Sequence, residues 1–111
     1  MEFEAPPEEK VEIKDVSEGE GAAAVSGDTV TMKYKGKLDD GSVFDSGSGF
    51  TFTIDGGEVI KGWDIGIKGM KEGGKRKLKV PAKLGYGKRG AMPEIPPNSQ
   101  LNFVVQLQKI N

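Results

Sequence analysis

Hydrophobic and polar residues alternate along several separate stretches of the chain. In the clearest stretch, residues 29–38, Val30, Met32 and Tyr34 fall on one side of an extended backbone, and Lys33 and Lys35 fall on the other. Alternation with a period of two residues predicts a half-buried β-strand. The same pattern predicts further strands beginning at residue 10 and over residues 43–44, 50–54, 75–80 and 101–107.

One segment follows the period of a helix instead. Val59, Trp63 and Ile67 recur every four residues, which predicts one short helix. Asp55 and Glu58 precede it with the spacing of a capping box. We therefore expect Asp55 to be the N-cap residue and Glu58 to complete the box.

Turn-forming residues separate these elements. Asp40-Gly41 lies between two strand stretches and predicts a hairpin turn. Residues 17–27 and 84–97 are rich in small residues, glycine or proline and indicate loops, and a loop as long as the second is often functional. Because the strand stretches do not alternate with helices, we expect an α+β fold, an antiparallel sheet of five to six strands with one short α-helix on one face.

Length and composition suggest one domain with a tail. The chain has 111 residues, enough for a single hydrophobic core. Residues 1–9 include four glutamates and two prolines, so we expect a flexible acidic tail there and a folded domain over residues 10–111. Neither a signal peptide nor an apolar run long enough for a membrane span is visible. We expect a cytoplasmic protein, with the nucleus as the alternative, no membrane partner and a monomeric state.

Charge and missing residue types exclude several functions. The 16 Lys and Arg residues against 17 Asp and Glu residues give a net charge of −1, without the positive excess typical of nucleic-acid-binding proteins. The chain has no His and no Cys, which excludes a disulfide, a thiolate nucleophile, a Ser-His-Asp triad and a Cys- or His-ligated metal. We expect no nucleic-acid partner, no metal and no cofactor.

Two glycine-rich motifs resemble phosphate-binding loops but lack their context. Residues 69–75 have P-loop spacing, yet Arg76 stands where the motif needs Ser or Thr, and residues 85–90 fit G-x-G-x-x-G but are followed by prolines rather than by a helix. We interpret both as turns. Lys75, Arg76, Lys77 and Lys79 are consistent with a nucleic-acid patch or with the solvated face of an edge strand, and the balanced net charge favours the edge strand.

Six aromatic residues could share one surface, although each alone is also consistent with a core position: Tyr34, Phe44, Phe50, Trp63, Tyr86 and Phe103. A longer string is more specific. It comprises residues 34–38, Asp40-Gly41, Val43-Phe44-Asp45-Ser46, Gly57-Glu58-Val59-Ile60-Lys61-Gly62-Trp63-Asp64, Tyr86-Gly87, Ile95-Pro96-Pro97 and residues 101–107. In order and spacing, this string resembles the FKBP-type peptidyl-prolyl cis–trans isomerases, the macrolide-binding immunophilins.

The resemblance implies a curved sheet wrapped around the short helix, with an apolar pocket between them, and an enzyme that assists protein folding by isomerising X–Pro bonds in proline-containing polypeptides. It also implies binding of tacrolimus and rapamycin. Trp63 is implied as the pocket floor, with Tyr86 and Ile60 donating hydrogen bonds from a hydroxyl and a backbone N–H. The implied catalytic residues are Asp45, Trp63, Tyr86 and Phe103, and the implied ligand-binding residues are Tyr34, Phe44, Asp45, Phe50, Glu58 (through its backbone carbonyl), Val59, Ile60, Trp63, Tyr86, Ile95 and Phe103.

Two segments depart from the family pattern. Residues 46–49 are shorter than usual and lack the basic residue that commonly steadies the aspartate, so we expect the Asp45 carboxylate to be freer. Residues 91–94 place the charge of Glu94 where an apolar rim residue is typical. These departures keep a second hypothesis open, a module that binds proline-containing or macrolide ligands with little turnover. A third hypothesis is a nucleic-acid module that uses the basic strand.

Overall fold

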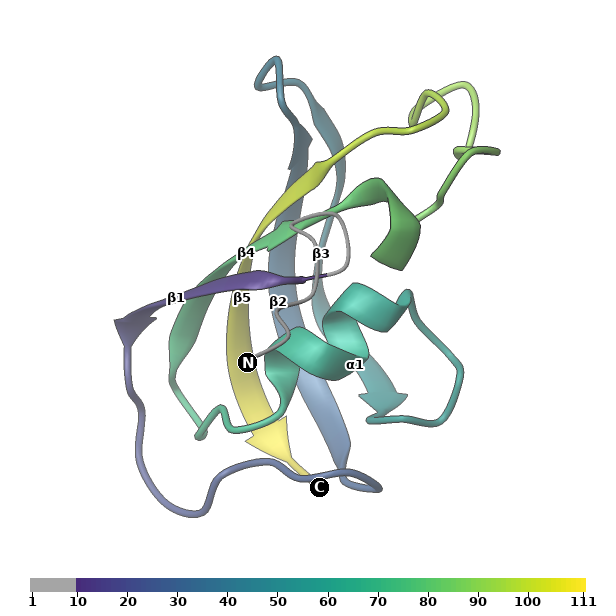
Figure 1. Cartoon of the computed structure of the whole chain (residues 1–111). Coiled ribbons are helices and arrows are strands. Elements are labelled where there is room, and N and C mark those ends of the chain that lie inside the picture. Colours follow the sequence, from purple (N-terminus) through teal and green to yellow (C-terminus); the bar gives the residue numbers. More distant parts are fainter. Residues whose placement is uncertain (1–9) are drawn as a thin grey trace, which may run out of the picture.

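One antiparallel sheet and one short helix form the structure, a computed structural model that describes residues 10–111 (Figure 1). The strands are β1 (Glu12–Ser17), β2 (Thr29–Leu38), β3 (Val43–Thr53), β4 (Lys75–Val80) and β5 (Leu101–Ile110), the α-helix is α1 (Lys61–Ile67), and the 3₁₀ helix is η2 (Ala82–Leu84). The strand order is β1-β4-β5-β2-β3, and every neighbouring pair is antiparallel. The predicted α+β fold is confirmed, and the predicted tail over residues 1–9 lies outside the described residues.

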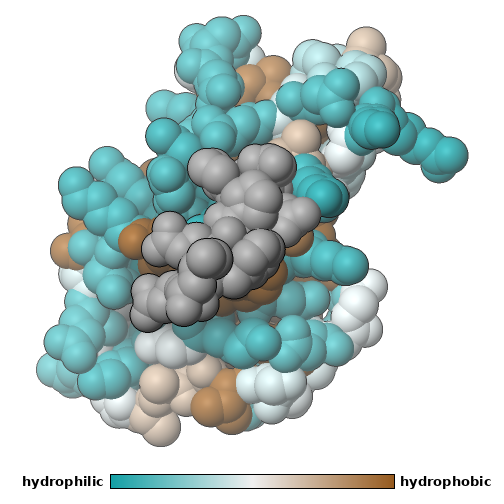
Figure 2. All heavy atoms as spheres, viewed as in Figure 1, coloured by the Kyte–Doolittle hydropathy of each residue, from teal (hydrophilic) through white to brown (hydrophobic). Residues whose placement is uncertain are grey.

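The core lies between α1 and the face of the sheet that the helix covers. Alternate residues of β2 and β5 point to this face, as the sequence pattern predicts, and they are fully buried at Val30, Met32, Leu101, Val105 and Leu107. Figure 2 shows that hydrophilic residues cover most of the visible surface outside the grey region, with hydrophobic residues in small separate areas. No helix in the described part of the chain is long and apolar enough to cross a membrane.

Two glycines allow α1 to lie directly on β4. A Cβ atom added to Gly62 would lie 2.4 Å from a methyl carbon of Val80, and one added to Gly66 would lie 2.7 Å from a methyl carbon of Leu78. Real Cβ atoms do not approach that closely, so any larger residue would move the helix away from the sheet. The helix backbone therefore approaches the sheet closely, and this approach fixes the depth of Trp63 in the core.

The predicted capping box is wrong. The N-cap residue of α1 is Ile60, and no side chain caps the helix. Glu58 Oε2 instead accepts a hydrogen bond from the backbone N–H of Thr53 at 2.8 Å, and the backbone N–H of Asp55 donates to Asp64 Oδ1 at 2.9 Å. These carboxylates hold the turn between β3 and α1, because that turn has its own backbone groups to satisfy.

The predicted edge position of the basic strand is also wrong. β4 lies between β1 and β5, and its Arg76 points toward the helix rather than to solvent. Arg76 Nη1 donates to the carbonyl oxygens of Gly66 and Lys68 at 2.9 and 2.7 Å, and Arg76 Nε donates to Asp15 at 2.6 Å. An alternating pattern reveals which residues share a face but not the order of strands, so the sequence could not place β1 outside β4.

The predicted long loop between β4 and β5 is confirmed. It begins with η2, and its tip is closed by an antiparallel bridge between Ala91 and Ile95, whose two N···O distances are 2.8 and 2.9 Å. Residues 69–74 form the turn from α1 into β4, and no helix follows residues 85–90, as predicted for both glycine-rich motifs.

We expect the Gly62→Ala variant to be less stable than the wild type in urea unfolding. Overpacking costs roughly 1–3 kcal/mol, which exceeds the gain of up to about 1 kcal/mol that Ala brings to a helix. The matched control is Ile65→Ala on the exposed side of the same helix, where a change within about 0.5 kcal/mol is expected. A Gly62→Ala variant more stable than wild type would contradict the close approach.

Candidate functional site

A cavity of about 190 Å³ opens between the sheet, the segment before α1 and the loop after η2. Its lining comes from six parts of the chain, most of which only the fold brings together. The lining residues are Tyr34 of β2, Phe44, Asp45 and Phe50 of β3, Glu58, Val59 and Ile60 before the helix, Trp63 of α1, Tyr86 after η2, and Phe103 of β5. Ten of the eleven ligand-binding residues predicted from the sequence therefore surround one cavity.

The Trp63 indole forms the floor of this cavity. The side chain is only 4% exposed, and Tyr34, Phe50 and Phe103 meet its ring edge-on, with centroids at 5.0, 6.0 and 5.5 Å. Its Nε1 has no hydrogen-bond partner in the described part of the chain. Aromatic packing rather than a hydrogen bond therefore sets the orientation of the indole.

A glycine missed by the sequence analysis shapes one wall. Phe44 and Phe103 pack edge-on at 5.5 Å across Gly36 of β2. A Cβ atom at Gly36 would lie 2.5 Å from Phe44 Cζ and 2.8 Å from Phe103 Cε1, so only glycine leaves room for both rings. The signal was present in the sequence, because Gly36 interrupts the apolar positions of residues 30–38 on the predicted inner face.

Tyr34 and Asp45 form a polar pair at the cavity edge. The Tyr34 hydroxyl donates to Asp45 Oδ2 at 2.8 Å, and the backbone N–H of Ser46 donates to Asp45 Oδ1 at 2.9 Å. Within residues 10–111 no cation forms an ion pair with Asp45, as the missing basic residue predicts, but Tyr34 and Ser46 each hold one of its carboxylate oxygens. Burial, followed by the hydrogen bond and the charge of Asp45, raises the pKa of Tyr34 to about 12.

Two donors at the cavity are not engaged by the described residues. The backbone N–H of Ile60 lies just before the first turn of α1, where it has no helical partner, and it donates to no described group. The Tyr86 hydroxyl makes no hydrogen bond within residues 10–111, and its side chain is 42% exposed. The cavity can therefore hold an apolar ring over Trp63 while these two groups bind carbonyl oxygens.

The structure places Ile95 and Glu94 away from the cavity lining. Ile95 is 4% exposed and packs in the core, because its backbone bridge to Ala91 turns the side chain inward. Glu94 is exposed on the same loop and does not line the cavity. Within residues 10–111, no three His, Cys, Asp or Glu side chains gather as they would to bind a metal ion.

Comparison with known proteins identifies relatives along most of the chain. Residues 20–108 match the profile of the FKBP-type peptidyl-prolyl cis–trans isomerase family. The FK506-binding protein 4 of Rhizopus delemar is 57% identical over 98 residues, covering 86% of this chain and 26% of that protein. The FK506-binding protein of Neisseria meningitidis serogroup A is 50% identical over 102 residues, covering 88% of this chain and 94% of that protein.

A solved structure has the same fold. The peptidyl-prolyl cis–trans isomerase of Pseudomonas syringae superposes with a TM-score of 0.83 at 29% sequence identity, covering 91% of this chain and 75% of that one. The chain thus spans about a quarter of the fungal relative (26%) and nearly the whole of the Neisseria relative (94%).

The raised pKa of Tyr34 can be measured directly. In a Tyr86→Phe variant, Tyr34 is the only phenol, and we expect its ultraviolet titration to have a midpoint near 12 rather than at the ordinary value of 10.0. The folded state then holds the proton more tightly than the unfolded state. This contribution to stability is complete below pH 10 and is lost as the pH rises from about 10 to about 12.

The Tyr34→Phe variant is the control for that loss. Its free energy of unfolding should not show the same fall over this alkaline range, because it has no phenol at residue 34. A midpoint close to 10 in the Tyr86→Phe variant would show that Asp45 and burial do not act on the Tyr34 hydroxyl.

Proposed function

Because the chain belongs to the FKBP-type peptidyl-prolyl cis–trans isomerase family, we propose that it accelerates rotation about X–Pro bonds by holding the prolyl ring over Trp63. The observation that supports this mechanism most strongly is the buried indole with three aromatic rings edge-on to it, at the floor of a cavity that also offers two unengaged donors. The substrates are proline-containing polypeptides, and the consequence is faster folding of chains limited by proline isomerisation.

Rotation about the X–Pro bond is accelerated by removing water from the amide and does not require a proton transfer. Amide resonance opposes rotation with a barrier of ~18–20 kcal/mol, and the twisted state has lost that resonance and much of the carbonyl polarity. Water stabilises the planar, polar form more than the twisted one. A cavity that removes this water therefore lowers the barrier, which explains how a chain without His or Cys can catalyse the reaction.

The free energy of desolvating the substrate amide is large enough to account for catalysis. Leaving an amide without water or another partner costs roughly 2–7 kcal/mol, and each ~1.4 kcal/mol of difference between planar and twisted states changes the rate tenfold. Burial of the prolyl ring against Trp63 supplies the binding free energy that offsets this desolvation. A difference of about 3–5 kcal/mol, within this range, gives an acceleration of roughly two to four orders of magnitude.

The groups at the rim position the substrate. The Ile60 N–H and the Tyr86 hydroxyl donate to carbonyl oxygens next to the prolyl ring and hold the chain across the cavity. The Tyr34 hydroxyl keeps its proton far above neutral pH and remains bonded to Asp45. The Asp45 carboxylate thereby fixes the Tyr34 ring against the indole and gives the cavity one polar edge.

The same cavity is proposed to bind tacrolimus and rapamycin. The relatives from Rhizopus delemar and Neisseria meningitidis are named for binding FK506, which is tacrolimus. A macrolide that occupies the space over Trp63 excludes the prolyl ring, so rapamycin should inhibit isomerisation competitively.

The alternative is a module that binds these ligands with little turnover, and the departure that raises it is the short segment after Asp45. Gln108 holds this segment against β5, since its Oε1 accepts from Gly49 N at 3.0 Å and its Nε2 donates to Ser48 Oγ at 3.2 Å. A rim segment attached in this way is compatible with either function. The refolding assay below separates the two functions.

We expect the protein to accelerate the slow, proline-limited refolding phase of a test protein, and Trp63→Ala or Phe103→Ala to remove most of this activity. Because both residues also belong to the core, Tyr86→Phe is the second variant, with a loss of roughly 2- to 10-fold for one hydrogen bond of about 0.5–1.5 kcal/mol. Lys79→Ala, outside the cavity, should retain full activity.

An unchanged slow refolding phase with the wild-type protein, together with saturable rapamycin binding, would support the binding module and contradict the isomerase. Loss of activity in Lys79→Ala equal to that in Tyr86→Phe would contradict the assignment of the cavity.

We expect kcat/KM to be nearly constant between about pH 6 and 9. The reference pKa values of Asp, Glu and Tyr lie outside that range, and the pKa of Tyr34 is raised further, to about 12. An isomerisation assay with a Pro-containing peptide measures this dependence, provided that it uses no coupling protease, because the protease would have a pH dependence of its own. A bell-shaped profile with its maximum inside the range would indicate an acid–base step and contradict the desolvation mechanism.

A further inference from the structure

The outer face of the sheet, opposite α1, carries lysines in two rows on either side of β5. The strand register aligns Lys75 and Lys33 with Gln106, Lys77 and Lys35 with Val104, and Lys79 and Lys37 with Asn102. Asn102, Val104 and Gln106 of β5 therefore each lie between one lysine of β4 and one lysine of β2. We call the six side chains of Lys33, Lys35, Lys37, Lys75, Lys77 and Lys79 the lysine rows.

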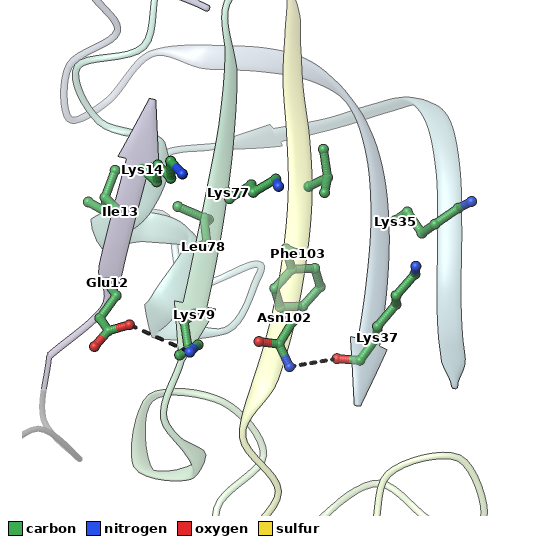
Figure 3. Close-up of a pocket in the computed structure, with 11 residues that line it drawn as sticks. Glu12, Ile13, Lys14, Lys35, Lys37, Lys77, Leu78, Lys79, Asn102 and Phe103 are labelled. Atoms are coloured by element: carbon green, nitrogen blue, oxygen red, sulfur yellow. Dashed lines mark hydrogen bonds and ion pairs between the residues drawn. The ribbon is translucent and has the colours of Figure 1, made fainter. Parts of the chain in front are cut away.

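A trough runs along β5 between the lysine rows. Two adjoining hollows, of about 460 and 620 Å³, share Lys35 and Val104 and together extend from Asn102 to Gln106. Figure 3 shows the first of them, with Lys77 and Lys79 on one side of β5 and Lys35 and Lys37 on the other. Val104, which is 45% exposed, lies where the two hollows of the trough meet. Both hollows are larger than the aromatic cavity, although the cavity holds the predicted site residues.

Acidic groups neutralise this face in part at its Asn102 end, where Asp39 accepts a hydrogen bond from Asn102 and interacts with the charge of Lys79. Within residues 10–111, Lys79 is the only member of the lysine rows with an ion pair, at 3.8 Å from Glu12. Lys14 of β1 adds to the excess because it lies directly opposite Lys77 in the register, and like charges in that position repel. A chain with a net charge of −1 thus concentrates positive charge on one face.

The spacing of the lysine rows matches an extended peptide. Alternate residues of a strand repeat at roughly 6.6–6.8 Å, and two strands separated by a third lie roughly 9.5 Å apart. An extended peptide laid along β5 points successive side chains to opposite sides with the same repeat. Six acidic residues in a row would therefore meet three lysines on each side, while the peptide backbone lies over Val104 and the lysine methylene groups.

Features that favour nucleic acid are missing from the described residues of this face. Base recognition by single-strand-binding proteins uses exposed aromatic side chains as stacking platforms. Two aromatic residues line the hollows, Phe103 and Tyr34, but both rings pack edge-on against Trp63 on the other face of the sheet. Arginine can form bidentate hydrogen bonds with phosphate, but Arg76 points to the face of the sheet that α1 covers. We propose that the trough between the lysine rows binds an extended acidic peptide segment of a partner protein.

This proposal does not depend on the proposed function, because the lysine rows lie on the other face of the sheet from the aromatic cavity. The probe is a fluorescein-labelled octaglutamate peptide, and fluorescence anisotropy measures its binding to the whole chain at 50 mM salt. We expect saturable binding that weakens strongly at 200 mM salt, since exposed charges are screened.

The test variant is Lys35→Glu with Lys77→Glu, one residue from each row, and we expect at least a tenfold loss of affinity. The matched control is Lys88→Glu with Arg89→Glu in the loop after Tyr86, which makes the same change in net charge at two exposed residues. The control should change affinity less than threefold. Circular dichroism verifies that both variants fold, and the isomerase activity of the test variant should equal that of the wild type.

Three outcomes would overturn the proposal: no binding of octaglutamate at 50 mM salt, equal loss of affinity in the test and control variants, or tighter binding of a twelve-nucleotide oligo(dT) than of octaglutamate at equal salt. The last outcome would assign the trough to nucleic acid instead. A loss of isomerase activity in wild type and test variant alike would count against the proposed function but not against peptide binding.

Discussion

The packing of aromatic rings around the Trp63 indole is the contact on which the aromatic cavity depends. The indole is buried, it has no hydrogen-bond partner among the described residues, and three rings contact it edge-on. This arrangement requires α1 to lie close to β4, which Gly62 and Gly66 permit. The close approach of α1 to β4 is therefore required for the cavity as well as for the core. If the helix lay farther from the sheet, the indole would lose its contacts with the three aromatic rings.

Local patterns in the sequence predicted where strands occur, but not all of their bounds or their burial. The stretches predicted at residues 43–44 and 50–54 are parts of one strand, β3, which ends at Thr53, and every residue of β1 is exposed despite its alternating pattern. The strand over residues 29–38 and the one over residues 75–80 have the predicted bounds. The capping box failed because Glu58 accepts a hydrogen bond from Thr53 at the end of β3 and the backbone N–H of Asp55 donates to Asp64 of α1, and no sequence spacing reveals these partners. The order of the strands was likewise hidden, since β1 pairs with β4 across more than fifty residues of chain.

The candidate site came from the resemblance to a family rather than from spacing. Ten of the residues that this resemblance implied line one cavity, whereas Ile95 turns into the core through its bridge to Ala91. Asp45 was expected to be freer but is held by Tyr34, a contact between β2 and β3 that depends on the register of the two strands. Gly36 was overlooked although it interrupts the apolar positions of residues 30–38, because the approach of Phe44 and Phe103 to it depends on how β3 and β5 pair with β2.

The central claim is that the space over Trp63 accepts a prolyl ring or its macrolide equivalent. Since Trp63 is the only tryptophan, its fluorescence reports on that space alone. Titration with rapamycin should change the emission intensity saturably at one molecule per chain, and the Phe44→Ala variant should bind more weakly. An emission that stays constant through the titration, while rapamycin remains unbound in equilibrium dialysis, would contradict the account.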